Sequence, residues 1–434
     1  MSSITSQLIG FNLKQIQPHI HQALITIPSK LVDPVFIEVS RCQKGFLDTY
    51  GFAKGTTPME YIVKHYKTDI AEQSKEFIFK YMVLHCLLNK IQEKKLPVAG
   101  EPRLRDIELE PGKGAKFVFD LSLVPPITFK EWKVFAFKAP KRKKYKDIDR
   151  QVITLMQDEQ AAEDKHTNKS ISIGDWVCFD ITPVDEKQMP LFKQIVETLW
   201  IKIGTEEADI PAQEAFVGKN LGQTFVASQI CFQDYFCTHL DTAFSFEVTI
   251  KDILYEAFFD LELFKRHFRI KTNRDMQKKL IEVFSFRNDI SQRRVMAEEA
   301  LALLISKHPL QVPRHILLRQ LEQVLSEVQD NPDYQVYRAE NSFNDYLESL
   351  ANKQAQEQIL IDQLCHRERI VVTPKDVKSY INLLQRPRMK EFIYFTPPVT
   401  KQRGQEVPIS NALMRKHCLR EKTLNHIIYH LTKK

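Results

Sequence analysis

Glycine, long apolar runs and secretory features are scarce or missing in this 434-residue chain. Its 12 glycines are few for this length, which favours helices over a loop-rich β fold. There is no run of 18 or more apolar residues, so the sequence predicts no membrane-spanning helix. The N-terminus, MSSITSQLIGFNLKQI, lacks the basic and apolar regions of a secretory signal. These absences predict a cytoplasmic protein that does not enter a membrane.

The common catalytic and metal-binding motifs are also missing. The seven cysteines contain no CxxC pair and are expected to be reduced, buried thiols. The sequence contains no Walker A loop, no GxGxxG after a strand and no GxSxG. His19 with His21, and Cys365 with His366, supply too few ligands for a metal site. We therefore predict no metal, no cofactor, and neither an energy-dependent nor a covalent enzyme.

The overall composition is that of a globular protein with several domains. Hydrophobic residues make up 43% and charged residues 27% of the chain, and its length suggests two to four domains. The net charge of +7 suits an acidic partner such as RNA, but it equally suits a solvated basic surface. Charge alone leaves both interpretations open.

The first part of the chain reads as two helices and a hairpin. Apolar residues from Leu31 to Cys42 have helical spacing, and Pro34 would be tolerated only in the first turn of that helix. Gly51 ends this helix, and Pro58 begins a long second one that runs to about residue 94. Residues 103–125 alternate like a β-hairpin around a turn at 111–114.

The remainder divides into a basic linker, a β-rich region and a helical region. Residues 137–150 carry seven Lys/Arg against two Asp, which is more typical of a solvated connector than of a nucleic-acid patch. Beyond the linker, strands are predicted at 171–182, 199–204, 224–232 and 244–256. From Phe258 onward the pattern is almost wholly helical, with starts at Pro313 and at the capping sequence Thr373-Pro374-Lys375-Asp376.

We therefore expect a multidomain α+β protein with three domains and one linker. An N-terminal helical-hairpin and β-sheet domain precedes the linker, a small β-rich domain follows it, and a large all-α C-terminal domain ends the chain. The expected boundaries are 1–136 for the first domain, 137–150 for the linker, 151–256 for the middle domain and 257–434 for the last.

The stretch GFAKGTTP, residues 51–58, lies between the two predicted helices and resembles the loop signature of trigger factor, the bacterial ribosome-associated chaperone. Gly51, Phe52, Gly55 and Pro58 match the family pattern Gly-Phe-Arg-x-Gly-Lys-x-Pro, and Lys54 takes its variable position. Ala53 and Thr56 replace the family's Arg and Lys, which puts affinity in doubt. The flanking IQEKKLPVAGEP and LVPPITFKEWK, and the later QVPRHILLRQLEQ, also resemble the family.

The resemblance implies that Gly51, Phe52, Lys54 and Gly55 form a docking loop for the large ribosomal subunit near the tunnel exit. Phe52 would enter an apolar pocket, and Lys54 would contact phosphate or acidic protein. The alternative is that the two glycines only shape a turn and that Phe52 packs inward.

The resemblance also implies that the middle domain is an FKBP-type peptidyl-prolyl isomerase. Phe192, Ile210, Tyr235 and Phe246 match walls of its catalytic pocket, which works by surrounding an X-Pro amide with apolar groups. Three other positions of the pocket depart from the family, namely Ile181, Pro183 and Gln213, and the polar Gln213 would stand in the floor of a pocket that must be apolar. We therefore expect weak or absent catalysis, and the four matching residues are equally compatible with an ordinary core.

The function implied is that of a ribosome-associated, ATP-independent chaperone. Exposed apolar patches on the C-terminal arms would hold nascent or unfolded polypeptides and assist their folding and export. The resemblance leaves open a homodimer off the ribosome. Two other functions remain as alternatives: a soluble FKBP-type prolyl isomerase and a basic RNA-binding factor.

Overall fold

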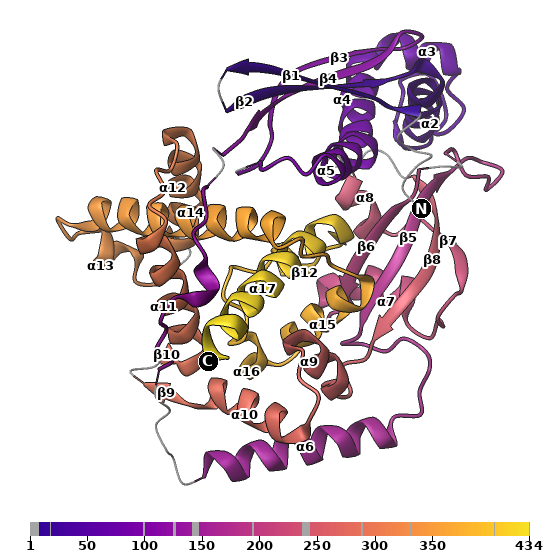
Figure 1. The fold of residues 1–434 in the computed structure, drawn as a ribbon. Helices are drawn as coiled ribbons and strands as arrows, with labels where there is room; N and C mark the ends of the chain where they lie inside the picture. Colours follow the sequence, from indigo (N-terminus) through magenta and orange to yellow (C-terminus); the bar gives the residue numbers. More distant parts are fainter. Residues whose placement is uncertain are drawn as a thin grey trace.

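The protein has a four-stranded sheet with helices at its N-terminus, a five-stranded sheet in the middle and a large helical region that ends the chain (Figure 1). The computed structural model describes residues 8–17, 19–98, 100–124, 127–140, 147–192, 195–236, 244–287, 290–329, 331–402 and 404–433.

The N-terminal sheet is antiparallel, with the order β1-β2-β4-β3. Its strands are β1 (Gly10–Gln17), β2 (Ile20–Ile27), β3 (Arg103–Glu110) and β4 (Gly114–Ser122). The predicted hairpin is confirmed as β3 and β4, and the alternating Phe117, Phe119 and Leu121 are buried. The sequence analysis did not predict β1 and β2, which complete the sheet.

One face of this sheet is covered by helices (Figure 1). They are α2 (Ser29–Phe46), α3 (Met59–His65), α4 (Lys67–Ile78), the π-helical turn η1 (Phe79–Val83) and α5 (Leu84–Glu93). The predicted long second helix is confirmed in outline, with a break at Tyr66 and the π-helical turn within it. The expectation for Pro34 was wrong: α2 begins at Ser29, so Pro34 lies in its second turn.

The segment after the N-terminal sheet packs into the helical region. It contains the short 3₁₀ helix η2 (Trp132–Val134). Trp132 is buried among α11 (Gln292–Lys307), α14 (Phe343–Arg367) and α17 (Asn411–Thr432). Its indole Nε1–H donates to Glu368 Oε1 over 3.2 Å. Contacts between distant parts of the chain therefore hold this segment in place.

The predicted basic linker is described only in part, since residues 141–146 lie outside the described ranges. Its last three residues are not linker, because they begin helix α6 (Ile148–Lys165). Ile148 and Val152 are buried, with Leu155 and Met156 partly buried beside them. The spacing of these four residues is helical, and this face of α6 packs on the C-terminal helices.

The middle region is built on an antiparallel sheet in the order β13-β6-β5-β8-β7. Its elements are β5 (Trp176–Val184), β6 (Glu197–Lys202), η3 (Glu207–Asp209), α7 (Ile210–Phe216), β7 (Thr224–Ala227), α8 (Ile230–Phe236) and β8 (Ser245–Leu254). All four predicted strands are present. The third was predicted too long, because residues from Ile230 onward form α8, where Phe232 and Phe236 are buried one turn apart.

The C-terminal region is mostly helical. Its helices are α9 (Leu261–Phe268), α10 (Asn273–Phe284), α11 (Gln292–Lys307), α12 (Arg314–Gln329), α13 (Tyr334–Arg338), α14 (Phe343–Arg367), α15 (Pro374–Leu384), α16 (Pro387–Lys390) and α17 (Asn411–Thr432). The expectation of an all-α region was wrong in detail. It also contains the two-residue strands β9 (Phe286–Arg287), β10 (Ile290–Ser291), β11 (Lys401–Gln402), β12 (Gln405–Glu406) and β13 (Ile409–Ser410).

β13 ties the C-terminal region to the middle sheet, because Ile409 and Ser410 pair with Trp200 and Leu199 of β6. Trp200 also donates its indole N–H to Asn411 at the start of α17, over 3.2 Å. The edge strand of the middle sheet is thus covered by a segment about two hundred residues further along the chain.

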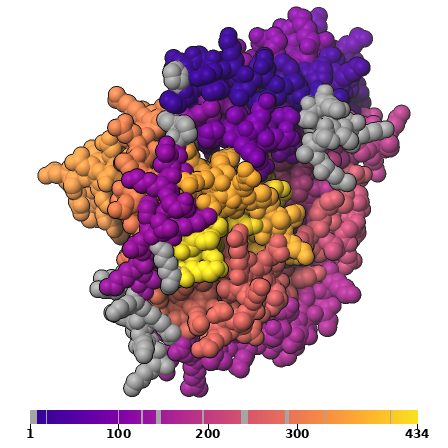
Figure 2. Space-filling model, in the orientation of Figure 1, coloured from indigo at the N-terminus to yellow at the C-terminus, as the bar shows by residue number. Residues whose placement is uncertain are grey.

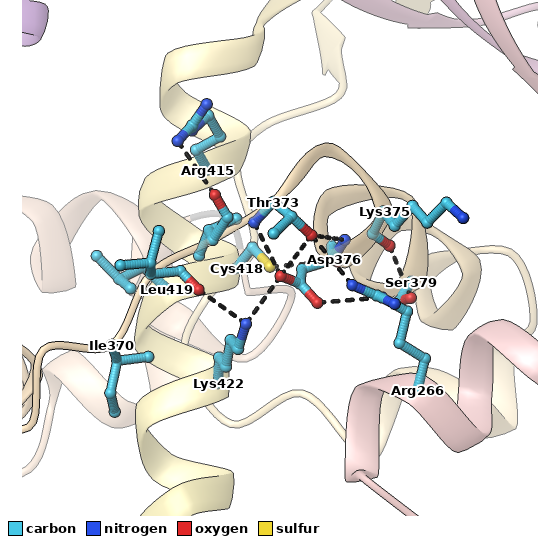
Figure 3. Close-up of polar contacts among 12 residues, drawn as sticks. Arg266, Ile370, Thr373, Lys375, Asp376, Ser379, Arg415, Cys418, Leu419 and Lys422 are labelled. Carbon is cyan, nitrogen blue, oxygen red and sulfur yellow. Dashed lines mark hydrogen bonds and ion pairs between the residues drawn. The ribbon is translucent and has the colours of Figure 1, made fainter.

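The predicted start at Thr373 is confirmed as a capping box on α15, in which Thr373 and Asp376 bond reciprocally. The same carboxylate joins two other helices, through Lys422 of α17 and Arg266 of α9 (Figure 3). Asp376 is therefore a junction of three helices.

Cysteines 42, 86, 178, 231, 365 and 418 are buried and form no disulfide with one another, whereas Cys237 lies outside the described residues. Within the described ranges, every helix is too short or too polar to cross a membrane.

Candidate functional sites

The loop between α2 and α3 is a tight turn that depends on two glycines. Gly51 and Gly55 have φ of +86° and +80°, in the left-handed region that favours glycine. A Cβ added at either position would meet no atom within 4 Å. Backbone conformation, and not crowding, is therefore what requires glycine at these two positions.

Hydrogen bonds between residues three apart close the turn around the two glycines. The Phe52 N–H donates to the Thr49 carbonyl over 3.0 Å, and the Thr56 N–H donates to the Ala53 carbonyl over the same distance. The Thr56 hydroxyl donates to that Ala53 carbonyl over 2.7 Å. Thr56, a departure from the family signature, thus closes the turn with its side chain.

The tip of this turn is open to solvent. Phe52 is 39% exposed, Tyr50 is fully exposed, and Lys54 is exposed beside them. The structure brings the predicted residues together in one projecting turn, and Phe52 does not pack into the core. Tyr50 was not predicted as a site residue, although it directly precedes the glycine of the signature.

The Phe52 ring rests on the first turn of α3. Its centroid lies 5.6 Å from that of Tyr61, and Tyr61 stacks on His65 at 4.0 Å. These contacts orient the Phe52 ring while leaving one side of it accessible. The turn and the start of α3 therefore form one surface with both aromatic and basic groups.

The second candidate site is a group of aromatic rings on the middle domain. Phe192 and Phe246 are buried, and the Phe246 ring lies 5.4 Å from that of Phe236 on α8 and 6.2 Å from that of Phe244. Tyr235 meets Phe236 edge-on at 4.8 Å, and burial raises the pKa of its phenol. We call Phe192, Tyr235, Phe236, Phe244 and Phe246 the aromatic face.

Ile210, the fourth predicted pocket residue, lies at the start of α7 and is 45% exposed. Gln213, one turn further, donates its side-chain amide to the Gly204 carbonyl over 2.8 Å. Ile181 and Pro183 are buried in β5. The aromatic rings and the Ile210 end of the predicted pocket thus differ sharply in exposure.

The N-terminal helix covers the aromatic face. Phe77 of α4 stacks on Phe244 at 4.4 Å, and Tyr81 of η1 lies 5.9 Å from Phe192 and 5.5 Å from Phe236. The sequence analysis did not predict this role for Phe77 and Tyr81. In the sequence, the only signal for this role is that Phe77 and Tyr81 are spaced by one helical turn. That spacing does not reveal that the two side chains pack on the middle region.

An arm of helices projects from the body of the protein. It is formed by α12, α13 and the start of α14, at the left of Figures 1 and 2. Inside the arm, Val324, Leu347 and Ala351 are buried between α12 and α14. The exposed apolar and aromatic side chains of the arm are Leu318, Val336, Tyr337 and Tyr346.

A projecting turn with exposed rings and an arm with exposed apolar groups are features of proteins that bind other macromolecules. Family models agree with this class. The model for "Bacterial trigger factor protein (TF)" matches residues 11–155, and the model for its C-terminus matches residues 274–397. The chain belongs to the trigger factor family, which consists of ribosome-associated chaperones.

Individual relatives are distant but extensive. A trigger factor of a Geobacter species is 22% identical over 362 residues, which are 77% of this chain and 78% of the relative. A trigger factor of Rickettsia canadensis is 20% identical over 336 residues, which are 76% and 74% of the two chains. A solved structure from work on "Promiscuous Substrate Recognition in Folding and Assembly Activities of the Trigger Factor Chaperone" covers 97% of this chain and 100% of that one. The two are 13% identical, with a TM-score of 0.37.

Proposed function

We propose that this chain docks on the large ribosomal subunit near the tunnel exit through the turn at residues 51–58. It would hold nascent polypeptides there without ATP and assist their folding and export. The observation that carries the proposal is the hydrogen-bonded turn in which Phe52 and Lys54 are both exposed. A preorganised turn loses little conformational freedom on binding, so its contacts contribute fully to affinity.

The chemistry of the turn suits a ribosomal surface made of protein and RNA. Phe52 offers an apolar ring for a pocket, and Lys54 offers a charge for phosphate or a carboxylate. Ala53 lacks the charge that the family signature carries, so Tyr50 and Phe52 would supply a larger share of the contact. Burial of an aromatic anchor of this kind typically contributes about 2 kcal/mol or more.

Cosedimentation with ribosomes tests the docking proposal. The double variant Phe52→Ala with Lys54→Ala should bind roughly thirtyfold more weakly than the wild type, as expected for the loss of about 2 kcal/mol. A matched control is Tyr429→Ala with Lys433→Ala, which removes another exposed ring with a lysine 5.2 Å away. Equal pelleting of the docking variant and the control would refute the assignment of this turn.

The arm of α12, α13 and α14 is the proposed client surface. Its exposed Leu318, Val336, Tyr337 and Tyr346 can contact apolar segments of an unfolded chain. Such contacts are weak and need no nucleotide.

For the middle region we propose an FKBP-like peptide-binding domain with weak or lost isomerase activity. Phe192, Tyr235 and Phe246 supply an aromatic surface of the kind that an X-Pro segment needs. The cover formed by Phe77 and Tyr81 leaves little of that surface accessible. We also propose the domain boundaries given above, except that the linker ends where α6 begins at Ile148, and α6 packs on the C-terminal helices.

A further inference from the structure

The contact between the N-terminal helix and the middle domain is built like a complex between a peptide and its binding site. Phe77 and Tyr81 lie one turn apart and are completely buried. Phe77 also approaches Phe236, at 5.5 Å, so the two side chains of the helix touch three rings of the aromatic face. The π-helical turn η1 lies at this contact, where it sets the direction of the Tyr81 side chain.

Polar groups complete the contact at the deepest ring. The Tyr81 hydroxyl donates to the Ile195 carbonyl over 2.5 Å and lies 3.0 Å from the Thr182 hydroxyl. Ile195 lies two residues before the start of β6, and Thr182 belongs to β5. Tyr81 thus makes two kinds of contact, with its ring against other aromatic rings and with its hydroxyl to a backbone carbonyl. A side chain of a bound peptide would make the same two kinds of contact.

Two ion pairs flank the rings. One turn beyond Tyr81, His85 Nδ1 lies 2.7 Å from Glu197 Oε2 of β6, and Glu197 is buried. On α2, Arg41 Nε lies 3.3 Å from Glu186 Oε1 in the loop after β5. The His85–Glu197 pair is largely enclosed by protein, whereas the Arg41–Glu186 pair is exposed and contributes little to the stability of the contact.

From these contacts we infer that the Phe77–His85 segment is an intramolecular occupant of the peptide site on the middle domain, and that it closes this site until the helix withdraws. The inference rests on the proposed function of the middle domain, namely that its aromatic face binds apolar, proline-containing peptides. Helix and peptide compete for the same rings, so the affinity for a peptide is reduced by the fraction of molecules that are closed.

The test uses the full-length protein and a dansyl-labelled Ala-Leu-Pro-Phe peptide followed by fluorescence anisotropy. Phe77→Ala with Tyr81→Ala should increase affinity for this peptide at least tenfold over the wild type, because both anchors of the closed state are removed. The matched control is Phe264→Ala, which truncates an equally buried ring on α9 of the C-terminal region and should leave peptide affinity unchanged. Adding Phe192→Ala to the opened variant should abolish the gain.

Tyr81→Phe keeps the test valid if the double truncation does not fold. It removes only the hydroxyl that bonds to Ile195, so we expect a gain of about threefold. Hydrogen exchange reports opening independently of peptide. Amides of residues 67–93 and 197–202 should exchange faster in either variant than in the wild type.

The outcomes distinguish failure of the inferred closure from failure of the proposed peptide site. If the wild type already binds the peptide as tightly as the opened variants do, the inferred closure is refuted and the peptide site stands. If hydrogen exchange shows opening but neither form binds the peptide, the peptide site itself is refuted, and this inference fails with it. A gain that survives Phe192→Ala would place binding elsewhere and would also overturn the inference.

Discussion

Removing the charge of Asp376 should weaken the C-terminal region by about 2 kcal/mol at neutral pH. One carboxylate oxygen, Oδ2, accepts from the Thr373 backbone N–H and from Lys422 Nζ, each over 2.8 Å. The other, Oδ1, lies 3.3 Å from Arg266 Nε (Figure 3). The variant Asp376→Asn keeps the shape of the side chain but loses the charge that attracts both cations.

The magnitude follows from the pKa of Asp376. Burial alone would raise this pKa, but hydrogen bonds from Lys422 and Thr373 outweigh burial and lower the pKa from 3.8 to about 2. Since one pKa unit corresponds to about 1.4 kcal/mol, the ionised group stabilises the fold by about 2 kcal/mol. Because the folded pKa is depressed, this contribution is fully present above pH 3.8 and is lost as the pH falls through 2.

Urea unfolding followed by circular dichroism measures the effect. Asp275→Asn is the matched control, because Asp275 occupies the same capping position on α10 beside Thr272 but is exposed. We expect Asp376→Asn to lower the free energy of unfolding clearly more than Asp275→Asn at pH 7. The deficit of Asp376→Asn should shrink to roughly half near pH 3. Equal effects of the two variants, or a deficit that does not change with pH, would refute the reasoning.

Two further predictions concern function. The double variant Val336→Asp with Tyr337→Asp places charges on the arm, so without nucleotide it should prevent less of the aggregation of a refolding protein than the wild type does. The control Val399→Asp, exposed elsewhere, should protect as well as the wild type. Equal loss of protection in both variants would contradict a client surface on the arm. The wild-type chain should isomerise a short X-Pro peptide only slowly in a protease-coupled assay, because Phe77 and Tyr81 cover the aromatic face; robust turnover would contradict this expectation.

Features that depend on neighbours in the chain could be predicted from the sequence. The capping box at Thr373 and Asp376 is local, and the alternation in β4 directly reports one buried face. The turn at residues 51–58 was predicted because Gly51, Phe52, Gly55 and Pro58 match the family signature, and the left-handed backbone at Gly51 and Gly55 agrees with that turn. The helical spacing of Ile148 and Val152 would also have revealed α6, but the charged residues around them favoured a linker.

The sequence by itself therefore determined the family, the glycine turn at residues 51–58, the hairpin, most helices and all four main strands of the middle region. Only the tertiary structure decided that β13 completes the middle sheet and that Tyr81 bonds to Ile195, a residue 114 positions away. The periodicity of a helix shows which of its faces is apolar, but it does not show what that face will cover. That choice depends on the shape and hydrogen-bonding groups of a surface assembled from distant segments, and here the surface is the aromatic face of the middle domain.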